Sequence, residues 1–355
     1  MTIIIATLII PFIIIILRFI YPAILRFVHK IGAPGIDVME TVEIGGIRQA
    51  LFFRGQNTEN PAILLIHGGP GGSQMQFIHN YQYEWEHDFT VVNWDQRNSG
   101  KTHYANDPEA VRGTINAQRA LKDAHEVTQY IKQKLGKDKI IIMGHSWGSV
   151  LGTMLVQAYP EDYSAFISVG QITNMTDNER VGYEKVLELA RIAGNRKDIA
   201  VLEAITPYSK QKGYNDASIK QMRVLRKIQG KYNLAMIVDI KTTIAANTSP
   251  YCTSREIAHY VAVEQKYYQG ALMHFLMEEF DIYNYGTNYA IPVYYIMGEN
   301  DWQTPYPLSK EFFEKITAPD KAFFSVPDAG HFPMMDNKAE FTRVLLEGIG
   351  PLIRN

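Results

Sequence analysis

The clearest evidence for the fold is the segment Lys139-Ile-Ile-Ile-Met-Gly-His-Ser-Trp-Gly148. Its apolar half is typical of a short buried strand, and a G-x-S-x-G pattern centred on Ser146 follows directly. Apolar residues continue at helical spacing from 147 to 158. A serine on a cramped strand-to-helix turn needs glycines two positions away on either side, and the start of a helix favours negative charge. We therefore predict that Ser146 is a nucleophile; the alternative is an ordinary helix N-cap.

From residue 38 onward, short apolar runs alternate with helical patterns. Runs typical of buried strands stand at 62–66, 89–94, 139–143, 166–169, 291–297 and 322–326, after a hairpin at 42–53. Helical patterns stand at 116–135, 147–158 and 338–352. Strands that alternate with helices predict an α/β protein with a mostly parallel sheet and helices on both faces.

The interval 171–289 breaks this alternation. Its pattern is mostly helical, it is rich in tyrosine and methionine, and it offers no clear buried strand. Because the strand pattern resumes afterwards, we predict a helical cap at 171–289. The cap would be inserted into a core made of residues 38–170 and 290–355.

The first thirty residues differ in composition from the rest. Residues 2–25 are mostly apolar and carry no charged side chain apart from Arg18, and a helix needs about 20 apolar residues to cross a bilayer. We therefore predict an N-terminal hydrophobic helix at 1–30 that acts as a single-pass membrane anchor. A cleavable signal peptide and a buried or peripheral helix are the alternatives. The basic residues after the span favour a cytoplasmic catalytic domain.

A glycine-rich loop, His67-Gly-Gly-Pro-Gly-Gly72, follows the apolar run at 62–66. Glycines let a backbone approach a ligand closely and turn its N–H groups toward it. A tetrahedral intermediate needs two such donors, and we assign them to the N–H groups of Gly69 and Trp147. A plain tight turn is the alternative for the loop. We interpret His67 as a structural residue that holds the loop rather than as a catalytic histidine.

An acid and a base follow the last two predicted strands. Asp301 and Glu299 both come directly after the run at 291–297, and we favour Asp301 as the acid. His331 lies in a Gly-His loop after the run at 322–326 and before the terminal helical pattern. Ser146, Asp301 and His331 occur in the chain order that a strand-turn-helix serine site of this kind uses. We therefore predict nucleophilic acyl transfer with His331 as the base.

Five segments together resemble the proline iminopeptidase family, a capped branch of the α/β-hydrolases. They are His67-Gly-Gly-Pro-Gly-Gly72, Trp94-Asp-Gln-Arg97 with Ser99-Gly100, Ser146-Trp-Gly-Ser149, Gly298 with Asp301, and Gly330-His331. The resemblance implies an α/β-hydrolase fold with an inserted cap. It also implies an aminopeptidase that releases an N-terminal residue, often proline, from small peptides or amides. Asp95 and Arg97 would then form a structural brace beside the active-site loop.

The chain departs from the family pattern at several positions. Asn98 replaces a glycine, and His145 stands where many members have glycine. Val263-Glu-Gln-Lys-Tyr-Tyr268 resembles the family's I-E-N-H-Y-F, whose glutamate binds the substrate's free ammonium. The resemblance makes Glu264 the candidate substrate-binding residue, with a solvated helix face as the alternative. The family's second acidic ligand, in a W-x-x-W-E stretch, has no counterpart in the sequence, and Asp239 lies at a similar distance in a different context.

Composition excludes several other classes of function. A formal net charge of −2 over 355 residues gives no broad attraction to nucleic acid, so we expect no nucleic-acid partner. One cysteine, Cys252, allows neither an internal disulfide nor a multi-cysteine metal site. No Walker loop, H-E-x-x-H or dinucleotide motif is present, so we expect neither a cofactor nor a metal.

Two other functions remain open at this stage. A capped esterase, lactonase or amidase would use the same three residues on an ester or amide without requiring a free amine. A catalytically inactive binding protein would have the same fold without the enzymatic activity. The expected partner is therefore a small peptide, amide or ester substrate.

Overall fold

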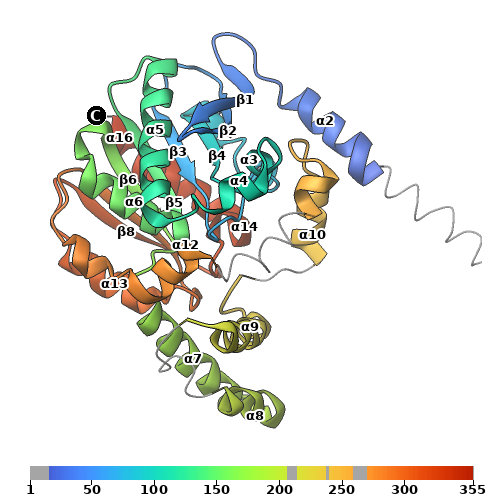
Figure 1. Ribbon diagram of the computed structural model, residues 1–355, viewed down its shortest axis with the longest axis vertical. Helices are drawn as coiled ribbons and strands as arrows, with labels where there is room; N and C mark the ends of the chain where they lie inside the picture. The colour runs from blue at the N-terminus through green and yellow to red at the C-terminus, as the bar shows by residue number, and fades with distance from the viewer. Residues whose placement is uncertain (1–15, 206–213, 237–239, 259–269, 355) are drawn as a thin grey trace, which may run out of the picture.

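The computed structural model describes residues 16–205, 214–236, 240–258 and 270–354. Its strands are β1 (Ile36–Ile44), β2 (Ile47–Gly55), β3 (Ala62–Ile66), β4 (Thr90–Asp95), β5 (Ile140–His145), β6 (Tyr163–Val169), β7 (Val293–Gly298) and β8 (Lys321–Val326). They form one sheet in the order β1-β2-β4-β3-β5-β6-β7-β8 (Figure 1). β1, β2 and β4 pair antiparallel, and every other pair is parallel. The predicted mostly parallel sheet is confirmed.

Helices cover both faces of this sheet. The α-helices outside the segment between β6 and β7 are α2 (Tyr21–Val28), α3 (Gly100–Tyr104), α4 (Pro108–Arg112), α5 (Ala117–Leu135), α6 (Trp147–Ala158), α13 (Tyr306–Lys315), α14 (Pro333–Asp336), α15 (Lys338–Arg343) and α16 (Gly350–Arg354). Short 3-10 or π turns are η1 (Ile16–Ile20), η2 (Ile78–Asn80), η3 (Trp85–His87), η4 (Pro160–Asp162) and η8 (Val344–Ile349). The long helix α5 begins at an Asn116 side-chain cap and ends at Gly136, which has φ 63°. The N-cap asparagine and the C-terminal glycine in the sequence therefore mark the two ends of this helix.

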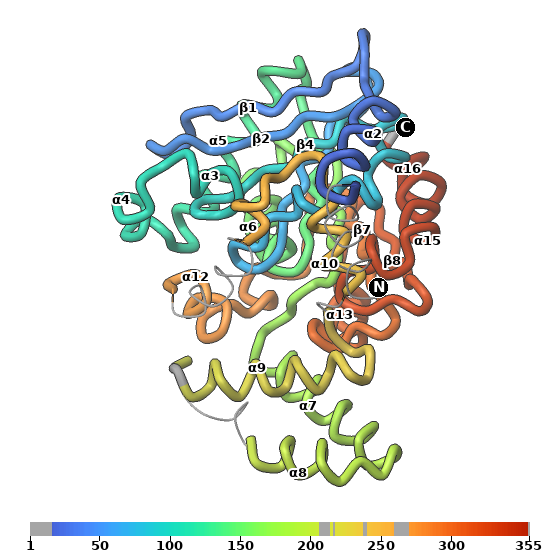
Figure 2. Tube along the Cα trace, turned by 90° about the vertical axis from the view of Figure 1, so that its right-hand side faces the viewer, coloured from blue at the N-terminus to red at the C-terminus, as the bar shows by residue number. Residues whose placement is uncertain are grey.

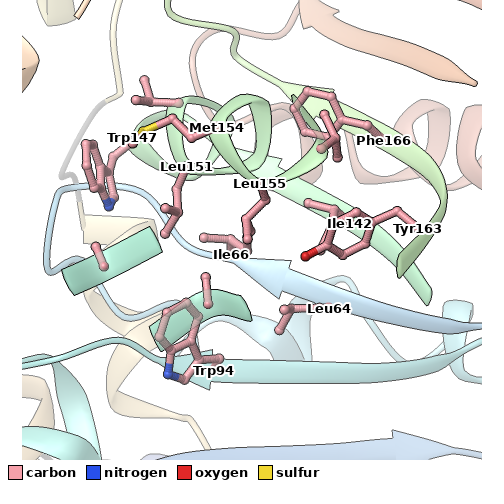
Figure 3. Close-up of a cluster of buried hydrophobic side chains, with 14 of the residues drawn as sticks. Leu64, Ile66, Trp94, Ile142, Trp147, Leu151, Met154, Leu155, Tyr163 and Phe166 are labelled. Atoms are coloured by element: carbon pink, nitrogen blue, oxygen red, sulfur yellow. The ribbon is translucent and has the colours of Figure 1, made fainter. Parts of the chain in front are cut away.

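β5 is buried along its whole length because it lies in the middle of the parallel part of the sheet. Ile140 and Ile142 pack into one hydrophobic cluster, whereas Ile141 and Met143 pack into the cluster on the other face. Figure 3 shows Ile142 with side chains of α6 above the sheet. A strand covered on both faces needs an uninterrupted apolar run, which explains the Ile-Ile-Ile-Met sequence.

The segment between β6 and β7 is helical in the described residues. It contains α7 (Met175–Ile192), α8 (Arg196–Ala204), α9 (Asp216–Lys231), α10 (Ile240–Asn247), α12 (Ala271–His274), η6 (Phe275–Glu279) and η7 (Ile282–Tyr285). α7, α8 and α9 enclose their own small apolar cluster, which includes Val186, Leu202 and Leu225. These three helices lie beyond one end of the sheet (Figures 1 and 2). The division into a core and a cap at 171–289 stays an interpretation of this arrangement.

The predicted single-pass membrane anchor at 1–30 is wrong, and the predicted cytoplasmic side of the catalytic domain loses its basis with it. Across the described residues, no helix combines the length and the apolar character that crossing a membrane requires. In the described part of this segment, residues 16–30, the helical elements are η1, with 5 residues, and α2, with 8 residues. Arg18 donates to the carbonyl oxygen of Cys252, and Arg26 donates to that of Pro250, so both arginines contact the rest of the chain. Residues 2–15 of the predicted span lie outside the described residues.

A buried ion pair ties the antiparallel hairpin to α5. Arg97, directly after β4, donates through Nε and Nη2 to the two carboxylate oxygens of Asp123, at 2.8 and 3.0 Å. Its Nη2 also donates to the carbonyl oxygen of Gly45 in the turn between β1 and β2. The Asp123 side chain is fully buried, and Arg119 donates to it as well. Removing one partner of such a pair leaves a buried charge without compensation.

We expect Asp123→Ala to lower the free energy of unfolding by about 3–5 kcal/mol, because Arg97 stays buried without its carboxylate. Glu109→Ala is the matched control, since Glu109 pairs with Arg112 on the exposed surface. Loss of that pair should cost less than about 1 kcal/mol. Urea unfolding followed by tryptophan fluorescence measures both variants. Equal shifts of the two midpoints would show that Arg97–Asp123 is no more than a surface pair.

Candidate active site

Ser146 occupies the sharp turn between β5 and α6. Its φ of 56° and ψ of −119° lie outside the regions that residues with a side chain usually adopt. A Cβ at Gly148 would lie 2.0 Å from the carbonyl oxygen of Ile66, and one at Gly144 would lie 2.2 Å from that of Gly148. The main-chain N–H of Ser146 donates to Val169 at 2.9 Å, which fixes the turn against β6. The two glycines of the motif are therefore required by backbone packing.

The structure brings together three of the residues that the sequence analysis selected. His331 Nε2 lies 2.9 Å from Ser146 Oγ, and His331 Nδ1 lies 2.9 Å from Asp301 Oδ2. The exposed fractions of Ser146, His331 and Asp301 are 7%, 2% and 0%. Because the carboxylate only accepts, Nδ1 carries the proton and Nε2 is left to accept from the serine hydroxyl. The arrangement is chemically able to deprotonate Ser146 while it attacks an electrophile.

Asp301 is held as a hydrogen-bond acceptor on both of its oxygens. Oδ1 accepts the main-chain N–H groups of Gln303 and Thr304, at 3.0 and 2.9 Å, and Oδ2 accepts the Thr304 hydroxyl at 2.7 Å. These donors orient the carboxylate toward His331. Glu299, the other candidate acid, is exposed, so the geometry favours Asp301.

The glycine-rich loop passes directly beside Ser146. A Cβ at Gly68 would lie 3.0 Å from the Cβ of Ser146, and Gly69 has φ 114°, a conformation that glycine adopts most easily. Within the residues that the structure describes, the N–H groups of Gly69 and Trp147 donate to no protein acceptor. No acceptor within the described part of the protein uses the two predicted donors, and their role toward an oxyanion stays a prediction.

Gln96 joins the glycine-rich loop to the start of α6. Its side-chain Nε2 donates to the His67 carbonyl oxygen at 2.9 Å, and its Oε1 accepts the indole N–H of Trp147 at 3.0 Å. His67 is buried, and burial lowers its pKa to about 4, so the ring is neutral at neutral pH. His67 Nε2 accepts from the Gln96 N–H at 3.2 Å and also lies 3.0 Å from Ser99 Oγ. The geometry thus agrees with a loop-holding role for His67.

Three residues near His331 belong to the site but were not predicted from the sequence. A Cβ at Gly170, which has φ 59°, would lie 3.2 Å from Cε1 of His331. Asp336 accepts the N–H of Gly330, and burial raises the pKa of Asp336. His145 contacts the main chain of His331 at 2.7 Å. Only His145 carried a sequence signal, because it departs from the family pattern.

Two acidic residues named in the sequence analysis, Glu264 and Asp239, lie outside the described residues. In the part of the chain that is described, no group of three or more His, Cys, Asp or Glu side chains could hold a metal ion.

Comparisons with known proteins agree with the resemblance noted in the sequence. A family model described as "alpha/beta hydrolase fold" matches residues 61–338. The "Probable aminopeptidase YbaC" of Bacillus subtilis (strain 168) is 26% identical over 323 residues, covering 87% of this chain and 95% of that protein. A "Proline iminopeptidase" of Lactobacillus delbrueckii subsp. bulgaricus is 31% identical over 114 residues, covering 32% of this chain and 37% of the relative.

Solved structures show the same fold at lower identity. The crystal structure of a proline iminopeptidase-related protein from Thermus thermophilus gives a TM-score of 0.62 at 17% identity. The match covers 90% of this chain and 99% of that chain. The predicted resemblance to proline iminopeptidases is therefore confirmed.

We expect Gly170→Ala to slow reaction of Ser146 with a fluorophosphonate probe by about 3- to 10-fold. A Cβ 3.2 Å from His331 Cε1 would displace the ring by a few tenths of an ångström, and a full shift of about 1 Å at a reacting group costs up to about 100-fold. The new methyl group would press on the imidazole of His331. Gly194→Ala is the matched control, since Gly194 also has a positive φ, 63°, but has open space around it. Both variants carry the same backbone strain. Equal labelling rates would contradict the idea that Gly170 supports the position of His331.

Proposed function

Because the chain belongs to the α/β-hydrolase fold family, we propose that it is a serine hydrolase of the aminopeptidase type. It would release an N-terminal residue from small peptides or amides through an acyl-enzyme on Ser146. The observation that carries the proposal is the hydrogen-bonded sequence Ser146–His331–Asp301, with both distances at 2.9 Å.

The mechanism follows from the donors and acceptors of these three side chains. His331 Nε2 takes the hydroxyl proton of Ser146 while Oγ bonds to the substrate carbonyl carbon. The proton then passes from His331 to the leaving amine as the C–N bond breaks, and the acyl group remains on Ser146. A water molecule, deprotonated by His331, then bonds to the acyl carbon. The bond from that carbon to Ser146 Oγ breaks, His331 returns the proton to Oγ, and the acid is released. Asp301 stays ionised and stabilises the imidazolium.

The negative charge of the tetrahedral intermediate is assigned to two main-chain donors, Gly69 and Trp147. Support comes from the proximity of the glycine-rich loop to Ser146 and from the start of α6 at Trp147. The N-terminus of a helix favours an anion. A fixed donor of this kind is worth about 100- to 1000-fold in turnover. Gln96, which bonds to both segments, would keep the two donors at a constant separation.

Recognition of a free amine is supported by two observations. Two of the relatives carry the names aminopeptidase and proline iminopeptidase. Residues 263–268 resemble the segment that supplies the ammonium ligand in that family, which assigns this role to Glu264. A capped esterase, lactonase or amidase is the alternative, and the absence of a W-x-x-W-E stretch from the sequence favours it.

We expect Ser146→Ala to reduce hydrolysis by several orders of magnitude, on the order of 10⁴-fold or more, while the protein stays folded. The fold should survive because Ser146 contributes little apolar area and its N–H bond to Val169 does not need the hydroxyl. Turnover of chromogenic amides and esters, with circular dichroism as the folding check, measures this. Near-normal turnover by a folded variant would refute the nucleophile.

Asp301→Asn should lower kcat by about 10³- to 10⁴-fold, because an amide cannot hold His331 in the required tautomer. Glu299→Gln is the matched control, since Glu299 is exposed and two residues away. It should leave kcat within about 3-fold, as expected for a surface substitution. A larger loss in Glu299→Gln than in Asp301→Asn would show that the wrong acid was chosen.

Two kinds of chromogenic substrate separate the two candidate functions. Aminoacyl substrates are compared with a free and with a blocked N-terminus, and simple acyl esters have no amine. For an aminopeptidase, Glu264→Gln should lower kcat/KM for free-amine substrates by about 30- to 1000-fold, the loss expected when one partner of a desolvated ion pair is removed. Simple acyl esters should be hydrolysed at nearly the same rate. Glu188→Gln, on the exposed surface of α7, is the control. Equal rates on free and blocked substrates would favour the esterase or amidase.

A further inference from the structure

His145 lies directly before Ser146 and contacts the base through the main chain. Its Nε2 lies 2.7 Å from the carbonyl oxygen of His331, and its Nδ1 lies 2.8 Å from the side-chain nitrogen of Gln74. A carbonyl oxygen only accepts, so Nε2 must donate. In a neutral ring Nδ1 then accepts the N–H of Gln74. The two contacts therefore specify one tautomer of His145.

The surroundings of His145 keep this ring neutral. The residue is buried, and burial first, with the nearby His331 second, lowers its pKa to about 3. Its ring stacks on that of Phe332, with the centroids 5.1 Å apart and the planes 23° from parallel. A neutral donor adds no second positive charge beside the imidazolium that His331 forms during reaction.

His331 needs such support because of its place in the chain. It lies in the loop between β8 and α14, so no hydrogen-bond ladder of a strand or helix fixes its backbone. Asp336 accepts the N–H of Gly330 at 3.0 Å on one side of the base. His145 holds the carbonyl group of the base itself. A displacement of about 1 Å between reacting groups can cost about 100-fold in rate.

We propose that His145 is a positioning residue that fixes the His331 main chain to the end of β5. The strand that carries the nucleophile would then also set the distance from Ser146 Oγ to the base. This inference rests on the proposed function, because it assigns His331 the role of base. Gln74 contributes by donating to Nδ1, which leaves the Nε2 proton for the carbonyl group.

Two substitutions at one position test this role. In His145→Gln, the amide nitrogen can take the place of Nε2 and donate to the His331 carbonyl group. In His145→Asn, the shorter amide can reach Gln74 but not that carbonyl group. Each variant loses one of the two hydrogen bonds, so their melting temperatures should be similar. We expect His145→Asn to lower kcat for an acyl ester by about 10- to 100-fold at unchanged KM. His145→Gln should stay within about 3-fold of the unmodified protein, because the bond to the base is kept.

The results separate failure of this inference from failure of the proposed function. If the unmodified protein is not labelled by a fluorophosphonate at Ser146, the proposed function fails. If it is labelled, but His145→Gln and His145→Asn have equal kcat, only the positioning role is overturned. A loss of kcat that merely follows the folded fraction would also overturn it.

A measurement on the unmodified protein keeps the inference testable if a variant does not fold. The ¹⁵N chemical shifts of the His145 ring report which nitrogen carries the proton. We expect a neutral ring with the proton on Nε2 across the pH range in which the enzyme is active. A proton on Nδ1, or a ring that becomes charged near neutral pH, would contradict the proposal.

Discussion

The parallel pairing of β3, β5, β6, β7 and β8 is the constraint on which the site depends. Parallel strands end at the same edge of a sheet, so the loops that follow them meet there. Residues from five such loops contribute: Gly69, Ser146, Gly170, Asp301 and His331. Ser146 and His331 are 185 residues apart in sequence, yet the strand direction places them together. Loss of the parallel register would disperse the site even if each side chain remained.

Burial decides the electrostatics of the site. Asp301, His331 and Ser146 are almost inaccessible, and the histidines beside them, His67 and His145, have pKa values lowered to about 4 and about 3 by desolvation. Each neutral ring can then accept on one nitrogen and donate on the other. The polar groups thus form a network with fixed donor directions, which needs little reorganisation when charge develops. The network resists an alternative arrangement because a buried polar group that loses its partner is destabilising.

Local sequence patterns predicted the strands and the turn at Ser146, because these depend on short-range spacing. The acid and the base were predicted from the chain order that serine hydrolases with a G-x-S-x-G turn share. They did not reveal Gly170 or Asp336, whose roles depend on which loops meet at the sheet edge. The membrane prediction was wrong because an apolar composition does not show how long a helix is, and no described helix is long and apolar enough to cross a membrane. Arg18 and Arg26 instead bond to carbonyl groups 234 and 224 residues away. Glu264 lies outside the described residues, so the amine ligand stays a prediction from resemblance.

Covalent trapping of the acyl-enzyme shows whether Ser146 is the nucleophile. The enzyme is mixed with excess chromogenic acyl ester, quenched in acid within the first turnovers and digested for mass spectrometry. We expect the acyl group on Ser146 and an initial release of chromophore that approaches one equivalent per chain. Steady product formation with no acyl group on Ser146, or with the group on another residue, would contradict it.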